Sequence, residues 1–165
     1  MTAIDDVLAR NASFAAGFHD AERPARPARR LAIVACMDAR LDTFRALGLA
    51  PGDAHVIRNA GGVVTEDVIR SLVISQRLLG TREIMLIHHT DCGMQTFSDD
   101  ELKDAVETDT GLRPPFSFKP FADLEQDVRD SIAGIQASPF LPHRDRIRGF
   151  IYDCATGRLA EVDPA

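Results

Sequence analysis

The sequence lacks a long apolar run, an excess of positive charge and an even set of cysteines, and each absence excludes a class of protein. No apolar stretch approaches the roughly 20 residues needed to span a bilayer, so a membrane protein is not expected. The formal net charge of -6 removes the positive field that a nucleic-acid backbone would require. With 165 residues, 45% of them apolar, we expect one domain over residues 1–165.

The cysteines are three in number, Cys36, Cys92 and Cys154, which argues against a disulfide framework. The N-terminal sequence MTAIDDVLARNASF lacks the charged-then-apolar pattern of a secretory signal, so we expect a cytoplasmic protein. In that compartment cysteine serves metal binding, catalysis or burial. Cys154 has no partner signature around it, and we interpret it as structural.

The order of the predicted elements is typical of a single α/β domain with a mainly parallel sheet flanked by helices. Three continuous apolar runs predict strands covered on both faces, and helical patterns separate or follow them. The strands are expected at 31–36, 54–57 and 83–87, and the helices at 4–18, 65–80 and 121–135. Residues 1–30 form an N-terminal helix and a solvated connector arm. Residues 147–162 predict a C-terminal hairpin, and the proline-rich segment 108–121 is a lid, an interface or a cover over the domain's own surface.

Reactive side chains follow two of the predicted strands. Cys36 ends the first, and His89 and Cys92 follow the third. The carboxyl ends of parallel strands meet at one edge of a sheet, so these side chains converge if the two strands are neighbours. Two thiolates and one imidazole suit zinc and leave the fourth tetrahedral position to water, as in catalytic sites. Asp38 is a possible fourth ligand in an inactive state. Adjacent strand residues point to opposite faces, so His88 receives a core or supporting role.

Three motifs resemble those of the β-class carbonic anhydrases, in order and approximate spacing: Cys36-x-Asp38-x-Arg40, HVIRNAGG at 55–62, and His89-x-x-Cys92-Gly93. The similarity is greatest to the small prokaryotic branch and runs from the N-terminal helix to the C-terminal hairpin. It implies Zn²⁺ on the three ligands and reversible hydration of CO₂ to bicarbonate and a proton by zinc-bound hydroxide. It also implies a homodimer or a dimer of dimers, in which the N-terminal helix packs on the partner subunit.

The remaining motif residues receive roles in this mechanism. Asp38 is predicted to accept a hydrogen bond from the attacking water, and Arg40 to hold Asp38 off the metal through a two-pronged contact. Ala60 and Gly61 are predicted to line a dry substrate pocket, where a glycine lets backbone N–H groups approach CO₂ closely. The glycines equally serve the turn before the helix at Thr65, and the two uses are compatible.

Three other functions are open to the same residues. Hydrolysis of carbonyl sulfide or carbon disulfide would use the same scaffold, and His55, where plant-like members carry an aromatic residue, keeps this alternative open. A phosphatase with a cysteine nucleophile fits less well, because Cys36 and Arg40 enclose only three residues and one is an acid. A zinc-binding module without activity would be favoured if Asp38 stayed on the metal.

Overall fold

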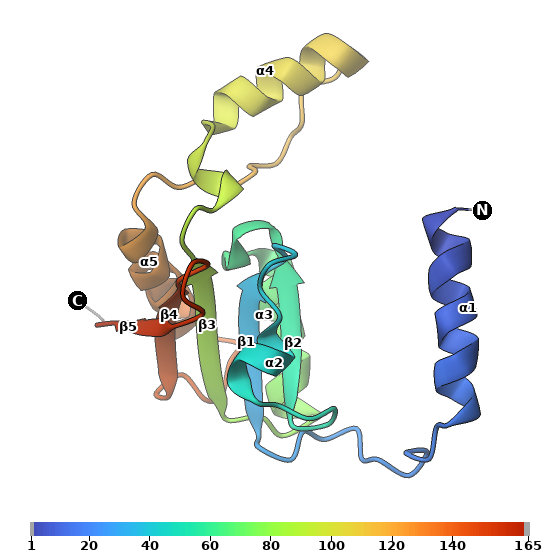
Figure 1. The fold of residues 1–165 in the computed structure, drawn as a ribbon. Coiled ribbons are helices and arrows are strands. Elements are labelled where there is room, and N and C mark those ends of the chain that lie inside the picture. The colour runs from blue at the N-terminus through green and yellow to red at the C-terminus, as the bar shows by residue number, and fades with distance from the viewer. Residues whose placement is uncertain (1, 164–165) are drawn as a thin grey trace.

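A computed structural model describes residues 2–163 and confirms the predicted α/β class, with a five-stranded sheet in the order β2-β1-β3-β4-β5 (Figure 1). Strands β1 to β4 are parallel, and β5 pairs antiparallel with β4 as the expected C-terminal hairpin. The strands are β1 (Leu31–Cys36), β2 (Ala54–Asn59), β3 (Glu83–His89), β4 (Ile147–Tyr152) and β5 (Leu159–Val162). The helices are α1 (Ala3–Ala16), α2 (Thr43–Leu47), α3 (Glu66–Arg77), α4 (Asp99–Thr110) and α5 (Leu124–Ala137).

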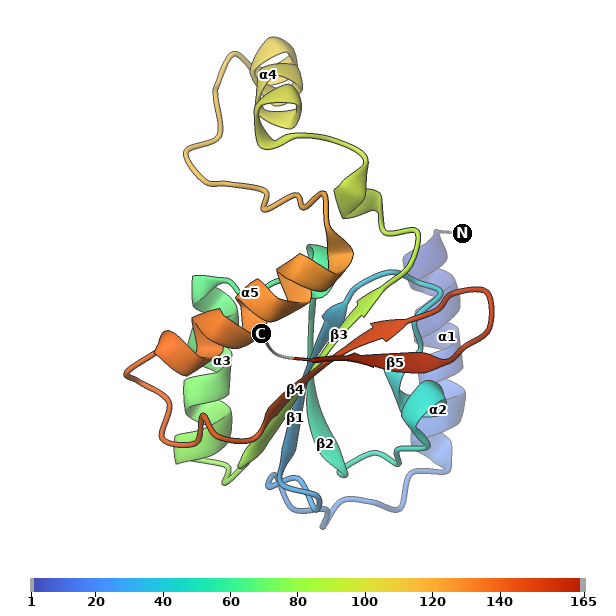
Figure 2. The same cartoon turned by 90° about the vertical axis from the view of Figure 1, so that its left-hand side faces the viewer.

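The sheet separates two apolar clusters. Helices α3 and α5 cover one face, and the short helix α2 lies on the other (Figure 2). The cluster beneath α3 and α5 contains alternate residues of β1 and β3 together with the apolar stripe of α5. The second cluster contains the other alternate residues and continues to the carboxyl ends of the strands, where it includes Cys36 and Cys92. Burial on both faces explains why β1 is apolar throughout.

The helix boundaries follow capping signals in the sequence. Thr2 and Asp5 form a capping box at the start of α1, and Thr65 caps α3 through the amide of Val68. Helix α5 begins at Leu124 because Asp123 caps it, and therefore starts later than the predicted 121. Phe121 therefore lies before the helix, and it packs with the cluster that contains Cys36 and Cys92.

Helix α4 was not predicted, and only its last three residues, 108–110, lie in the proline-rich segment 108–121. It begins with a capping box between Ser98 and Glu101, and no residue in it is buried. Arg113, which follows the helix, forms ion pairs with Asp100, Asp104 and Glu107. With no buried apolar face, α4 lacks the periodicity on which helix prediction depends. It projects beyond the carboxyl ends of the parallel strands (Figure 1).

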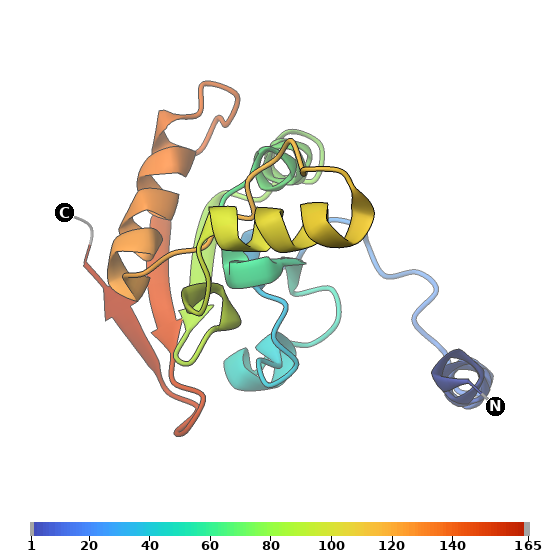
Figure 3. The same cartoon turned by 90° about the horizontal axis from the view of Figure 1, so that it is seen from above.

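Helix α1 lies apart from the sheet, at the end of the connector (Figure 3). None of its residues is buried, although one side of it is apolar. The exposed apolar side chains are Ile4, Val7, Leu8 and Phe14, with Phe18 just beyond the helix. Within residues 2–163, no helix is both long and apolar enough to cross a membrane.

Gly149 on β4 offers a test of how tightly α5 packs on the sheet. A Cβ at this position would collide with Val128 and lie 3.0 Å from Ile132 Cδ1. We expect Gly149→Ala to lower the free energy of unfolding by roughly 1–3 kcal/mol, as overpacked cores do. Gly134→Ala on α5 is the matched control, because its Cβ would meet only Val64 Cγ1 at 3.9 Å. The control should gain roughly 0.5–1 kcal/mol from helix propensity. Denaturant unfolding measures both, and equal stabilities would contradict the packing described here.

Candidate metal centre

The predicted metal ligands converge at the carboxyl ends of β1 and β3. Cys36 is the last residue of β1, His89 is the last of β3, and Cys92 follows after a two-residue turn. One ligand atom from each lies within 4.8 Å of the other two. The two cysteines are 4% exposed and the histidine is fully buried. The spacing of these atoms and their softness suit a tetrahedral cation site with three protein ligands.

The imidazole of His89 is oriented for coordination. Its Nδ1 lies 2.9 Å from the carbonyl oxygen of Thr90, which assigns the ring proton to Nδ1. Its buried Nε2 has no hydrogen-bond partner among the described residues. A buried ring nitrogen with a free lone pair is costly unless something binds it. A metal ion at this nitrogen would remove that cost, so the residues present fit the group that the sequence implies.

The pKa values of the two thiols shift in opposite directions because their sulfurs lie close together. The neighbouring Cys92 thiol is the main reason that the pKa of Cys36 is lowered, and the backbone N–H groups of Asp38 and Gly61 lower it further. The same contact and burial raise the pKa of Cys92, although the N–H of Met94 opposes the rise. The neighbouring Cys36 sulfur raises the pKa of His89 against the effect of burial. Protons and a cation would therefore compete for these side chains.

Asp38 and Arg40 form the predicted two-pronged pair. Arg40 donates from Nε to Asp38 Oδ1 at 3.0 Å and from Nη2 to Oδ2 at 2.8 Å. This contact holds the pKa of the Asp38 carboxyl well below its usual range. Asp38 Oδ2 lies 3.7 Å from His89 Nε2, so the carboxylate borders the metal position while its two oxygens remain bonded to Arg40.

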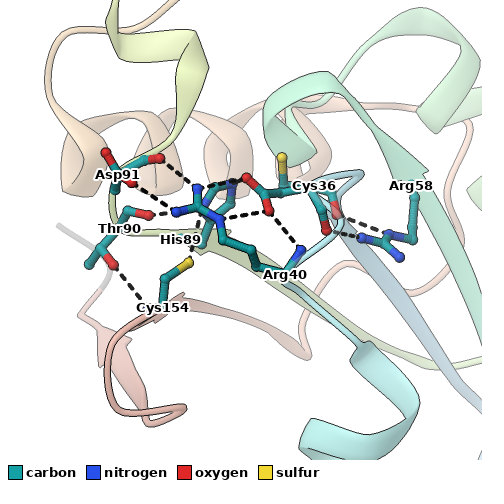
Figure 4. A network of polar contacts seen from close by, with 8 residues as sticks. Cys36, Arg40, Arg58, His89, Thr90, Asp91 and Cys154 are labelled. Carbon is teal, nitrogen blue, oxygen red and sulfur yellow. Dashed lines mark hydrogen bonds and ion pairs between the residues drawn. The ribbon is translucent and has the colours of Figure 1, made fainter.

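Three further residues complete this network, and none of them was singled out from the sequence (Figure 4). Arg58 donates to the carbonyl oxygens of Cys36 at 3.0 Å and Asp38 at 2.7 Å, which fixes the backbone that carries both side chains. Asp91 accepts from Arg40 Nη1 at 2.8 Å. Cys154, interpreted above as structural, places its sulfur 3.5 Å from His89 Nδ1. Of these three residues, Arg58 is the one that a sequence motif could have indicated, because it belongs to the RNAGG motif.

His88 points away from the metal ligands. Its Nε2 lies 2.7 Å from Asp127 Oδ2 on α5, and its ring centroid lies 5.6 Å from that of Phe121. It therefore has the supporting role in the core that strand alternation predicts for it.

Ala60 and Gly61 begin a 3-10 turn directly after β2, beside the metal ligands. Gly61 has φ 84°, and a Cβ there would lie 3.1 to 3.2 Å from side-chain carbons of Met94, Val63 and Phe121. These three side chains make the surroundings of the turn apolar. The backbone N–H of Gly61 helps to lower the pKa of Cys36, which gives this glycine a structural use beside the predicted one at the substrate.

Comparisons with known proteins agree with these motifs. A family model described as carbonic anhydrase matches residues 31–114. β-Carbonic anhydrase 1 of Mycobacterium tuberculosis is 57% identical over 99% of this chain and 100% of its own length. The carbon disulfide hydrolase of Saccharolobus solfataricus is 37% identical over 79% of this chain and 76% of its own. The crystal structure of carbonic anhydrase from Streptococcus mutans superposes with a TM-score of 0.93, at 48% identity and 99% coverage of both chains.

Proton competition makes the metal affinity pH-dependent. The raised pKa of Cys92 keeps a proton on its thiol, and the raised pKa of His89 favours protonation of Nε2 as the pH falls, so a cation competes with protons at both side chains. We expect affinity for Zn²⁺ to fall by at least about tenfold for each unit of pH between about pH 8 and about pH 6. Competition with a chromogenic chelator measures it. His89→Ala should bind more weakly and show a shallower pH dependence, and an affinity independent of pH would contradict this account.

Proposed function

The chain belongs to the β-class carbonic anhydrase family, and from this premise we propose that it catalyses the reversible hydration of CO₂ to bicarbonate and a proton. The proposed cofactor is Zn²⁺, held by Cys36, His89 and Cys92. The observation that carries the proposal is the buried Nε2 of His89, which has no hydrogen-bond partner within residues 2–163 and lies beside two thiol sulfurs. When bound, zinc would lower the pKa of a water to near neutrality and so supply hydroxide.

We propose that Asp38 and Arg40 orient the attacking water and keep the fourth coordination position of the metal open to it. Asp38 accepts a hydrogen bond from the attacking water and so directs its lone pair at the carbon of CO₂. Arg40 supports this role because it engages both carboxylate oxygens, which keeps Asp38 from becoming a fourth ligand. The strong depression of the Asp38 pKa keeps the carboxylate ionised and able to accept.

The proposed substrate pocket uses Ala60 and Gly61. CO₂ is small and carries no charge, so an apolar wall binds it without the desolvation that a polar wall would require. The side chains of Val63, Met94 and Phe121 beside Gly61 supply that apolar environment.

Carbon disulfide is the second candidate substrate, with carbonyl sulfide of the same class. Carbon disulfide hydrolases match this chain at 37% identity or less, over 79% of its length. The β-carbonic anhydrase of M. tuberculosis matches at 57% over 99%. The fuller match favours CO₂ as the substrate.

We further propose that residues 1–165 form a single domain. This domain assembles as a homodimer or a dimer of dimers, in which the N-terminal helix and connector arm (residues 1–30) pack on the partner subunit. The exposed apolar side of α1 supports this, since a lone helix of this length gains little stability without packing. A cytoplasmic location is proposed because the three cysteines are free thiols, which a reducing compartment preserves.

Removing one sulfur tests the function. Cys92→Ser should lower zinc content from about one ion per chain to below about a tenth, because a serine hydroxyl is a poor zinc ligand. CO₂ hydration, followed by stopped flow, should fall at least about 100-fold. Cys154→Ser serves as the control for zinc content and should retain the ion. Sulfide release from carbon disulfide and carbonyl sulfide, assayed in parallel, should be slower than CO₂ hydration. Full zinc occupancy with normal turnover in Cys92→Ser would refute the assignment.

Removing the guanidinium tests the role given to Arg40. Arg40→Ala should retain most of the zinc, because the three ligands are unchanged, yet lose roughly 10- to 100-fold in turnover as Asp38 becomes free to coordinate. Arg70→Ala is a matched control, because it removes an exposed arginine paired with Asp67 on α3. A fully active Arg40→Ala enzyme would contradict the role of a clamp.

A further inference from the structure

Asp91 lies between two metal ligands in the sequence and contacts Arg40 twice. Its carboxylate accepts from Arg40 Nη1 at 2.8 Å, and its backbone oxygen accepts from Nη2 at 2.9 Å. The same guanidinium makes two hydrogen bonds to Asp38. Arg40 therefore joins the loop after β1, which carries Asp38, to the loop after β3, which carries Asp91 (Figure 4).

The backbone of Asp91 is left-handed, with φ 56°. Residues with a Cβ rarely adopt this conformation, although aspartate and asparagine tolerate it better than most. At Asp91 the conformation accompanies a carbonyl oxygen in contact with the guanidinium of Arg40. The chain thus keeps a locally unfavourable conformation at the turn between His89 and Cys92.

The contact is too exposed to matter much for folding. The Asp91 side chain is 84% exposed and that of Arg40 is 48% exposed, and ion pairs in water contribute little to stability. The contact instead orients the guanidinium of Arg40. Arg40 is long and flexible, and contacts on both edges of the guanidinium restrict it more than a contact on one edge.

We propose that Asp91 is a positioning residue that acts through Arg40 on Asp38. Asp91 holds one edge of the guanidinium, so that the other edge presents Nε and Nη2 to the two oxygens of Asp38. The effect on turnover rests on the proposed function, because it requires that Asp38 orient the attacking water. The effect on Arg40 itself does not.

Two substitutions separate the carboxylate from the backbone. Asp91→Gly removes the side chain, retains the carbonyl acceptor and relieves the left-handed strain, since glycine adopts positive φ freely. Asp91→Asn keeps an acceptor oxygen and a tolerated backbone. Asp67→Asn, at an exposed Asp67–Arg70 pair on α3, is the control away from the site.

The first measurement follows the Arg40 Nε–H by NMR in zinc-free and zinc-loaded protein, with the signal assigned by its loss in Arg40→Lys. Its exchange with water should accelerate by about tenfold or more in Asp91→Gly and by less than about threefold in Asp91→Asn, and stay unchanged in Asp67→Asn. This result is independent of substrate. If CO₂ is not hydrated at all, the proposed function fails while the positioning of Arg40 is still decided.

The second measurement sets turnover against stability. Asp91→Gly should keep full zinc content and a melting temperature at or above that of the parent, yet hydrate CO₂ roughly three- to tenfold more slowly. In an Arg40→Ala background the same substitution should cause no further loss, because the two residues act in series. Unchanged Nε–H exchange in Asp91→Gly would overturn the proposal. So would a loss of turnover that persists at full size when Arg40 is absent.

Discussion

The site depends on the parallel pairing of β1 with β3. Ala35 of β1 is aligned with Ile87 of β3, so the last residue of each strand lies at the same edge of the sheet. Side chains alternate across a strand, and a register one residue different would turn His89 to the α5 face and bring His88 to the cysteines. The apolar residues of β3 that pack on α5 resist that shift. Burial of ordinary core residues therefore determines which of two adjacent histidines can meet a metal.

The charges around the ligands balance in a way that permits their burial. Two thiolates would neutralise a divalent cation, and Arg40 neutralises Asp38, so the loaded centre needs no uncompensated charge in the interior. Without a cation, the interaction between the two neighbouring sulfurs lowers the pKa of one thiol and raises that of the other. A further carboxylate in contact with Arg40, that of Asp91, stays in solvent, where its charge costs little.

The sheet and the convergence of Cys36, His89 and Cys92 could be predicted from the sequence because both depend on local patterns. Continuous apolar runs marked β1 and β3, and the reactive residues stood directly after them. Arg58 also stands directly after an apolar run, but its role, like those of Asp91 and Cys154, could not be predicted in that way. Each of the three acts through contacts made 20 to 65 positions away, which depend on how loops turn. Helix α4 was not predicted for a different reason. Its caps are visible, but it buries no side chain, so its residues show no apolar periodicity.

The turn after β2 shows that the centre is shaped by backbone as much as by side chains. Gly62 has φ 72°, and a Cβ on it would lie 2.8 Å from the amide nitrogen of Cys36 and 3.0 Å from the carbonyl oxygen of Ile87. The turn therefore lies directly against the ends of β1 and β3, closer than any side chain would allow. That contact brings Gly61 close to Cys36, while the Arg58 side chain holds the carbonyls of Cys36 and Asp38. Because the turn lies against the ends of β1 and β3, the fold fixes the positions of the predicted ligands, and binding of a metal there would need little rearrangement.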